Sequence, residues 1–224
     1  MRSAAENARR KSRSENARRA SSWRSPAGTF ADQADVTNTF QSIYDRELWN
    51  DGSGGGSVLK ASVALYLGYV QHFIERHDIR TIVDVGCGDW TFSRFLDLGD
   101  RHYVGLDVVP SVIERNEQRY ARENVQFRLI SPSKIDAYPA SDLIICKDVL
   151  QHLSNEHVDL VLMRMENAKY AIITNDHALD NRENQNGDTR PLDVTAPPFH
   201  LIATPVLWFD KKLTVLRTRV EDPT

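Results

Sequence analysis

The sequence has few cysteines and no long apolar segment. Its two cysteines, Cys87 and Cys146, form no CxxC pair and no cluster with histidines at zinc spacing. This pattern argues for a reducing compartment and against a structural metal, so we predict a cytoplasmic protein and no metal ligands. The uninterrupted apolar stretches fall far short of the roughly 20 residues that a transmembrane helix needs. We therefore expect no membrane partner.

The charges are unevenly distributed, with almost no acid in the first 25 residues. Residues 1–25 hold eight of the 28 Lys and Arg and two of the 31 Asp and Glu, so they carry +6 and the remainder carries 20 minus 29, or −9. This basic segment repeats "ENARR" and has almost no apolar residues before Trp23. It has too little to bury to offset its ordering entropy, which predicts a disordered tail over residues 1–29. A polyanion-binding arm and an organelle-targeting peptide are the alternatives.

The rest of the chain is predicted to be one globular domain with a preceding cap. A composition of 41% hydrophobic and 26% charged residues over 224 positions suits a protein with a single core. Residues 30–58 combine aromatic residues with a glycine-serine loop and form the predicted N-terminal cap segment. Apolar residues recur at helical spacing from Val58 to Ile74, which predicts a helix leading into a domain over residues 59–224.

Strands and helices alternate through this domain. The patterns predict strands at residues 81–86, 102–108, 125–130, 141–148 and 170–176, and helices at residues 91–98, 110–124 and 154–168. Pro110 suits the first turn of one helix, and Ser154 suits the cap of another. The segments "PVLWFD" and "LTVLRTRV" near the end predict an antiparallel hairpin. The predicted fold class is α/β, a doubly wound and mostly parallel sheet with a C-terminal antiparallel hairpin.

A pair of glycines follows the first predicted strand. Gly86 and Gly88, in "VDVGCGD", stand at the strand-to-helix turn where sheets of this kind bind nucleotides. A dinucleotide fingerprint would need a third glycine where Thr91 stands, which argues against a pyrophosphate cofactor such as NAD. Asp107, 19 residues after Gly88 and at the end of the second strand, can accept the hydroxyls of a ribose. A nucleoside therefore still fits.

Three segments together resemble motifs of class I S-adenosylmethionine-dependent methyltransferases. They are "VDVGCGD", "VGLDVVPSVIERN" and "SDLIICKDVLQHLS". The resemblance covers most of residues 59–224 and implies a Rossmann-like methyltransferase fold with S-adenosylmethionine as cofactor. The segments "GSGGGS", "CGD" and "NGDTRPLDVTAPPF" are similar to a narrower group of small bacterial methyltransferases.

The resemblance also implies which residues bind the cofactor. The loop after the first strand would contact the amino acid part, the acid after the second strand the ribose, and the next residue the adenine. Residues after the fourth strand would face the sulfonium. The family often has an acid after the third strand, whereas this chain has Ser131, so we expect weaker affinity. The predicted cofactor-binding residues are Asp84, Gly86, Gly88, Asp107, Val108, Ser131, Lys147 and Asp148.

Catalytic candidates follow the fourth and fifth strands, where the reactive methyl group should point. His152 and Asp176 are predicted bases for an acceptor that must lose a proton, although His152 could instead be a hydrogen-bonded wall residue. Residues 176–199 show little periodicity, which predicts a lid over the acceptor. In this lid Arg190 or Asp193 would orient the substrate, or an internal ion pair would hold the loop shape. The predicted catalytic residues are Asp176, His152 and Arg190.

The sequence thus predicts methyl transfer to a hydroxyl or amine of a small polar metabolite, such as a sugar or a natural product. An RNA or protein methyltransferase that uses the basic tail is one alternative, and a nonenzymatic nucleoside-binding module is another. Nucleic acid is expected to bind only through the tail, because the remainder of the chain is acidic.

Overall fold

The computed structural model describes residues 33–49, 52–131 and 138–219, so the tail predicted over residues 1–29 lies outside the described residues. The strands are β1 (Thr81–Val85), β2 (His102–Asp107), β3 (Val125–Leu129), β4 (Ser141–Lys147), β5 (Ala168–Asp176), β6 (Thr204–Phe209) and β7 (Lys212–Thr218). The described α-helices are α2 (Gln33–Asp45), α3 (Ala61–Arg76), α4 (Pro110–Tyr120) and α5 (Asn155–Arg164). None of these helices has the length and apolar character needed to cross a membrane.

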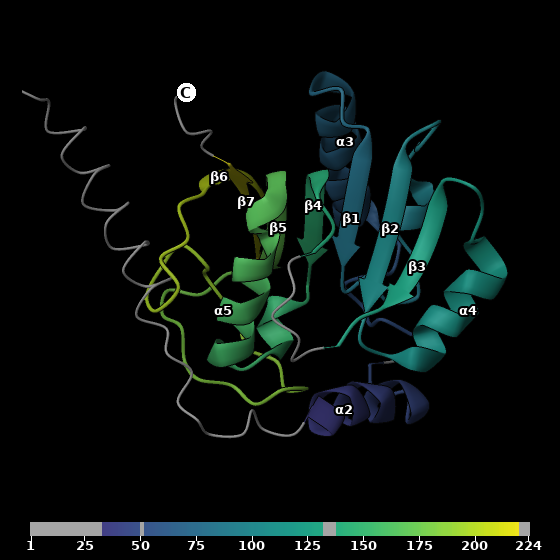
Figure 1. Ribbon diagram of the computed structural model, residues 1–224. Coiled ribbons are helices and arrows are strands. Elements are labelled where there is room, and N and C mark those ends of the chain that lie inside the picture. The colour runs from purple at the N-terminus through teal and green to yellow at the C-terminus, as the bar shows by residue number, and fades with distance from the viewer. Residues whose placement is uncertain (1–32, 50–51, 132–137, 220–224) are drawn as a thin grey trace, which may run out of the picture. The chain divides into compact units, whose positions relative to one another are not determined.

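The seven described strands form one sheet in the order β3-β2-β1-β4-β5-β7-β6 (Figure 1). Strands β1 to β5 pair in parallel, and β7 pairs antiparallel with both β5 and β6. The hairpin therefore closes one edge of a parallel sheet. This arrangement confirms the predicted α/β fold with its C-terminal antiparallel hairpin.

Alternating residues of β1 and β4 face two separate apolar cores. Val83 and Ile144 pack with residues of α2 and α5, whereas Ile82 and Ile145 pack with residues of α3. The alternation arises because successive side chains of a strand point to opposite faces of the sheet. In Figure 1, α5 and α3 lie on opposite faces of the sheet. Burial on both faces explains why these strands are apolar at nearly every position.

The helix predicted over residues 91–98 is not formed, and only a 3-10 turn, η1 (Ser93–Phe95), lies there. Trp90 adopts a φ of 58°, outside the right-handed helical region, and its ring is buried against Tyr103 and Phe127. The Ser93 hydroxyl donates to Asp84 over 2.8 Å. The prediction was wrong because these side-chain contacts fix a tight turn where the apolar spacing alone indicated a helix.

Helix α2, which the sequence patterns did not indicate, lies across the carboxyl ends of the strands (Figure 1). Its Phe40 and Ile43 are buried in the same core as α5. Gln41 Nε2 donates to the hydroxyl of Ser111, at the start of α4, over 2.8 Å. Because sheets of this type bind ligands outside the carboxyl ends of their strands, α2 covers the edge where a site is expected.

Candidate active site

A cavity of about 850 Å³ lies at the carboxyl edge of the sheet and extends along α5. Small-molecule sites usually measure roughly 300–1,000 Å³. The wall is formed by α2 and the glycine-rich segment after it, the loop after β1, the ends of β2, β4 and β5, and the start of β7. The structure brings eight of the predicted site residues to this cavity: Gly86, Gly88, Asp107, Val108, Lys147, Asp148, His152 and Asp176.

Two glycine-containing loops pack against each other in the cavity wall. Gly86 and Gly88 both have positive φ, and a Cβ atom on either would overlap a neighbour, Val149 for Gly86 and Ser53 for Gly88. The Ser53 hydroxyl accepts from Asp89 N over 2.8 Å and donates to Asp89 Oδ1 over 2.9 Å. The "GSGGGS" segment is thereby fixed onto the loop after β1. Backbone conformation and close packing alone already require glycine at both positions.

The carboxylate of Asp107 is held beside this loop by the backbone. Its Oδ2 accepts from Gly88 N over 3.0 Å, and its Oδ1 accepts from Val109 N over 3.1 Å. Burial raises the pKa of Asp107, and these hydrogen bonds oppose the rise. Each carboxylate oxygen has a further lone pair, so the group can accept ribose hydroxyls while the backbone fixes its orientation. Val108, the predicted adenine contact, lines the cavity next to it.

Asp84 lies beneath the loop and not in the cavity wall. It is 2% exposed and accepts hydrogen bonds from Ser93 Oγ over 2.8 Å and from the Tyr103 hydroxyl over 2.5 Å. Burial raises the pKa of Asp84 to about 6, although these hydrogen bonds lower it. The carboxylate thus holds the turn after β1, and a direct contact of Asp84 with the cofactor stays a prediction.

Ser131 is the second predicted cofactor residue that is absent from the cavity wall. The preceding residue, Ile130, lines the cavity, and Ile130 N donates to the carbonyl oxygen of Asp107 over 2.9 Å. This backbone contact fixes Ile130 next to Asp107 at the end of β3. The hydrogen bond from Ser131 to the adenine stays a prediction, and Ile130 is the neighbouring residue that lines the cavity.

Five charged side chains form a continuous set of ion pairs across the ends of β4, β5 and β7. Lys212 Nζ lies 2.6 Å from Asp148 Oδ1 and 2.6 Å from Asp176 Oδ1. Lys147 pairs with Asp148 at 2.6 Å, and Lys211 pairs with Asp176 at 2.5 Å. Burial would raise the pKa of Asp176, but the hydrogen bonds from the two lysines outweigh it and leave the pKa below its usual value. Asp176 is therefore ionised at neutral pH and a weak base.

His152, in the turn η2 (Leu150–His152), lines the cavity with a defined tautomer. Its Nδ1 lies 3.2 Å from the carbonyl oxygen of Asp188 and 3.0 Å from the Thr189 hydroxyl. Because a carbonyl oxygen can only accept, Nδ1 carries the proton and Nε2 has a lone pair, with Gln151 Nε2 as a donor 3.5 Å away. Burial lowers the pKa of His152, so the ring is neutral at pH 7. The ring packs on Trp49, with 4.8 Å between centroids.

Arg190, which was predicted to orient the substrate, is absent from the cavity wall. Its Nη2 donates to the carbonyl oxygen of Leu153 over 3.0 Å and to Asn155 Oδ1 over 2.8 Å. The guanidinium thus ties the loop after β5 to the start of α5. This loop also contains Asp188, whose carbonyl oxygen accepts from His152, so Arg190 stabilises the site without contacting the cavity. These contacts favour the alternative role in holding the loop shape, through hydrogen bonds to the residue after η2 and to the first residue of α5.

Lys212 is a cavity residue that the sequence analysis missed. It stands opposite Asp176 in the antiparallel register of β5 and β7. The predicted hairpin had Lys211 and Lys212 in its turn, and only the additional antiparallel pairing of β7 with β5 brings Lys212 opposite Asp176. Trp49 was also missed, since the position that its aromatic ring reaches depends on how α2 packs on the sheet.

Residues 83–168 match the family model described as "Methyltransferase domain". The matched segment contains the glycine loop, Asp107 and His152. This segment matches a methyltransferase domain. The resemblance to S-adenosylmethionine-dependent methyltransferases is confirmed, and the predicted cofactor agrees with it, whereas the narrower bacterial group stays a prediction. No curated protein matches the chain.

Solved structures of other methyltransferases share the fold of this methyltransferase domain. The N-methyltransferase NodS from Bradyrhizobium japonicum WM9, in complex with S-adenosylhomocysteine, is 16% identical with a TM-score of 0.58, and the match covers 82% of this chain and 100% of NodS. The 1,6-didemethyltoxoflavin-N1-methyltransferase of Burkholderia thailandensis is 15% identical with a TM-score of 0.58, covering 87% of this chain and 93% of that enzyme. Magnesium protoporphyrin IX methyltransferase (ChlM) from Synechocystis PCC 6803 is 14% identical with a TM-score of 0.56, covering 84% and 100%. At these identities the likeness shows the fold alone.

Proposed function

We propose that the protein transfers a methyl group from S-adenosylmethionine to a hydroxyl or amine of a small polar metabolite, such as a sugar or a natural product. The observation that carries the proposal is that Asp107, the glycine loop and His152 line one cavity. A ribose-binding acid and a proton acceptor in one enclosed site meet the two requirements of such a transfer, which are positioning and removal of a proton.

The residues around the glycine loop fit the cofactor. Asp107 would hold the ribose, Val108 and Ile130 would contact the adenine, and the backbone at Gly86 and Gly88 would contact the amino acid part. When bound, the cofactor supplies an electrophilic methyl group on its sulfonium. The chain itself holds the acceptor in line with that group and excludes water, with α2 and the "GSGGGS" segment forming part of the wall.

His152 is the group we assign to proton removal. Its Nδ1–H is held by Asp188, so Nε2 is the atom that accepts the acceptor's proton. A positioned base contributes roughly 100- to 10,000-fold to rate. Asp176 is less suited to this role, because its two oxygens are paired with Lys211 and Lys212. In this proposal Asp176 fixes the lysines at the edge of the cavity, and Arg190 positions the loop that orients His152.

Two considerations support a small acceptor. The Burkholderia enzyme with the same fold has 1,6-didemethyltoxoflavin bound in its structure, which is a small molecule. Beyond residue 25 the chain carries a net charge of −9, from 20 basic and 29 acidic residues, which disfavours binding of nucleic acid by the domain. RNA or protein as acceptor stays an alternative that depends on the basic tail. A cytoplasmic location fits two cysteines that are both free.

The test is turnover to S-adenosylhomocysteine with a library of hydroxyl- and amine-bearing metabolites. The enzyme hypothesis predicts cofactor binding and acceptor-dependent formation of S-adenosylhomocysteine. A nonenzymatic nucleoside-binding module predicts cofactor binding without turnover for any acceptor. Turnover with RNA or protein alone, lost on removal of residues 1–29, would favour the polymer alternative.

A further inference from the structure

Arg164, the last residue of α5, has a buried guanidinium with one edge unused. Its exposure is 4%, and its Nε and Nη2 atoms are buried without a hydrogen-bond partner. None of the ion pairs within the described residues involves Arg164. Buried charges and buried donors are nearly always paired, because leaving them unpaired costs about several kcal/mol. Among the described residues these two adjacent donors thus have no partner, and Arg164 lines the cavity, whereas Arg190, whose Nε and Nη1 also lack a partner, does not.

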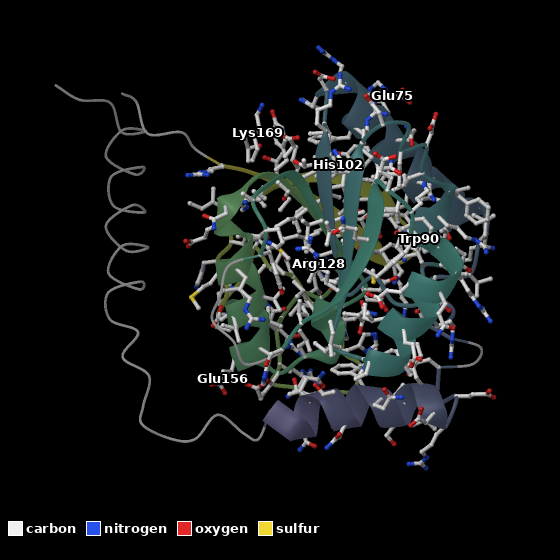
Figure 2. All side chains as sticks on the ribbon, turned by 45° about the vertical axis from the view of Figure 1, so that its right-hand side comes forward. Glu75, Trp90, His102, Arg128, Glu156 and Lys169 are labelled. Carbon is white, nitrogen blue, oxygen red and sulfur yellow. The ribbon has the colours of Figure 1, made fainter. Side chains whose placement is uncertain are left out.

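The position of Arg164 on α5 directs it into the cavity already described. Residues at positions i, i+4 and i+7 share one face of a helix, and His157, Val161 and Arg164 all line the cavity. Figure 2 shows Glu156, at the start of α5, beside α2, and Lys169, just beyond the helix, at the opposite end of the sheet. Side chains of a helix lean toward its N-terminus, so the guanidinium leans back toward His157. The distance along the axis from His157 to Arg164 is about 10 Å.

The surroundings of Arg164 are largely apolar and contain one further buried polar atom. The centroid of the Tyr138 ring lies 5.8 Å from Arg164 Cζ, and the buried Tyr138 hydroxyl interacts with the Arg164 guanidinium without a hydrogen bond of good geometry. Val161 and Ile130 contribute apolar surface to the same cavity. A charged contact is stronger in such surroundings than in water, because the effective dielectric constant is lower.

We propose that Arg164 binds a carboxylate of the methyl acceptor through Nε and Nη2, and that the Tyr138 hydroxyl donates to the same carboxylate. These two nitrogen atoms form one edge of the planar guanidinium, and their spacing matches the two oxygens of a carboxylate. The inference rests on the proposed function and narrows the acceptor to a hydroxy acid or amino acid. Such a molecule extends along α5 from Arg164, with its hydroxyl or amine toward His152.

The competing explanation is that Arg164 only stabilises the fold. Arg217 provides the matched comparison, because its Nη2 donates to the carbonyl oxygens of Met165 and Ala168 over 2.7 and 2.9 Å and it does not line the cavity. A structural arginine should lower stability when it is replaced by the apolar Met. Replacing a buried arginine whose donors are unpaired in the free protein should not lower stability, because the substitution removes an unpaired charge from the interior.

The experiment measures binding of carboxylates and their uncharged counterparts to the full chain saturated with S-adenosylhomocysteine. The pairs are benzoate with benzamide, cyclohexanecarboxylate with its amide, and glucuronate with glucose. For the wild-type protein we expect at least one carboxylate to bind tenfold or more tightly than its partner. Arg164→Met should abolish this preference with an unchanged or higher Tm. Arg164→Lys, which keeps the charge but loses the paired donors, should reduce the preference at least fivefold.

Arg217→Met should lower Tm and keep the preference. The proposal is overturned if no carboxylate of the series is preferred, or if the preference survives in both Arg164 variants. Binding of S-adenosylhomocysteine is measured in parallel for every variant. If the wild type does not bind S-adenosylhomocysteine, the proposed function is refuted. If it binds S-adenosylhomocysteine but shows no preference for carboxylates, only the role of Arg164 is refuted.

Discussion

The Nδ1 atom of His152 lies 3.2 Å from the carbonyl oxygen of Asp188. This contact leaves Nε2 unprotonated, and burial lowers the pKa of the ring, so His152 is neutral and able to accept a proton. The contact joins the turn after β4 to the loop after β5. Two segments that are far apart in the sequence therefore together determine that His152 Nε2 is unprotonated.

His152→Asn should reduce turnover at least 100-fold, on the scale of a positioned base, with S-adenosylhomocysteine affinity unchanged within about twofold. The asparagine amide can still donate to Asp188, so the loop should keep its shape. In the wild type, kcat/KM should fall as pH decreases through a pKa below the usual 6.5, because protonation removes the base. Rapid turnover by the asparagine variant, or a rate that does not change on the acidic side, would exclude His152 as the base.

Asp176→Asn should act mainly on stability, because Asp176 is paired with two lysines. We expect the free energy of unfolding at pH 7 to fall by on the order of 2 kcal/mol, between the effects of exposed and buried pairs. The lysines depress the folded-state pKa of Asp176, so its contribution is present above the unfolded pKa and is lost as pH falls through the folded value.

Denaturant titrations of Asp176→Asn and wild type between pH 3 and pH 7 measure this effect. The two proteins should converge in stability at low pH. A loss of turnover as large as that of His152→Asn, with stability unchanged, would instead assign the base to Asp176.

Asp84→Asn should change the pH dependence of stability in the opposite direction. Burial raises the folded-state pKa of Asp84 from 3.8 to about 6, so its contribution is full below the unfolded pKa and is lost as pH rises through about 6. Relative to the asparagine variant, the wild type should lose on the order of 3 kcal/mol between pH 3.5 and pH 7.

Asp142→Asn is the control for Asp84, because the pKa of Asp142 is lowered, with burial opposed by hydrogen bonds from Arg80 and Thr81. The stability of this variant should approach that of the wild type as pH falls. If the free energy of unfolding depends on pH in the same way for wild type and Asp84→Asn, the pKa of Asp84 is not raised by folding.

Arg190→Ala should lower stability and leave cofactor affinity unchanged within about twofold. Loss of the hydrogen bonds to Leu153 and Asn155 should reduce the free energy of unfolding by about 2 kcal/mol, which lowers Tm by about 4–8 °C in a chain of this size. Arg182→Ala is the control within the same loop, because Arg182 is exposed and its ion pair among the described residues is with exposed Asp180 at 3.6 Å. Equal Tm values for the two variants would contradict the bracing role.

The sheet could be predicted from the sequence because its strands are apolar runs of the expected length separated by turn residues. β1 and β4 are buried on both faces, so each reads as a near-continuous apolar segment. The segment after β1 could not be predicted, since the left-handed conformation of Trp90 and the contact of Ser93 with Asp84 come from tertiary packing. Local spacing carries no information about such contacts.

The candidate site was predictable where position along a strand determines it, as for Asp107 at the end of β2. Arg190 was assigned to the substrate because its loop leaves the correct edge of the sheet, but the direction of a long side chain depends on its partners. The position of Asp84 also depends on its partners, since hydrogen bonds from Tyr103 and Ser93 hold it beneath the loop. Sequence order places a backbone at an edge, and packing decides which side chains face the ligand.

The measurement that tests the central claim most directly is calorimetric titration of the full chain with S-adenosylhomocysteine and with NAD. We predict that S-adenosylhomocysteine binds and NAD does not. Asp107→Ala should weaken S-adenosylhomocysteine binding by about 1.5 to 3 kcal/mol, or on the order of 10- to 100-fold, with the variant shown to be folded by circular dichroism. Tight binding of NAD, or unchanged S-adenosylhomocysteine affinity in a folded Asp107→Ala variant, would contradict the assignment.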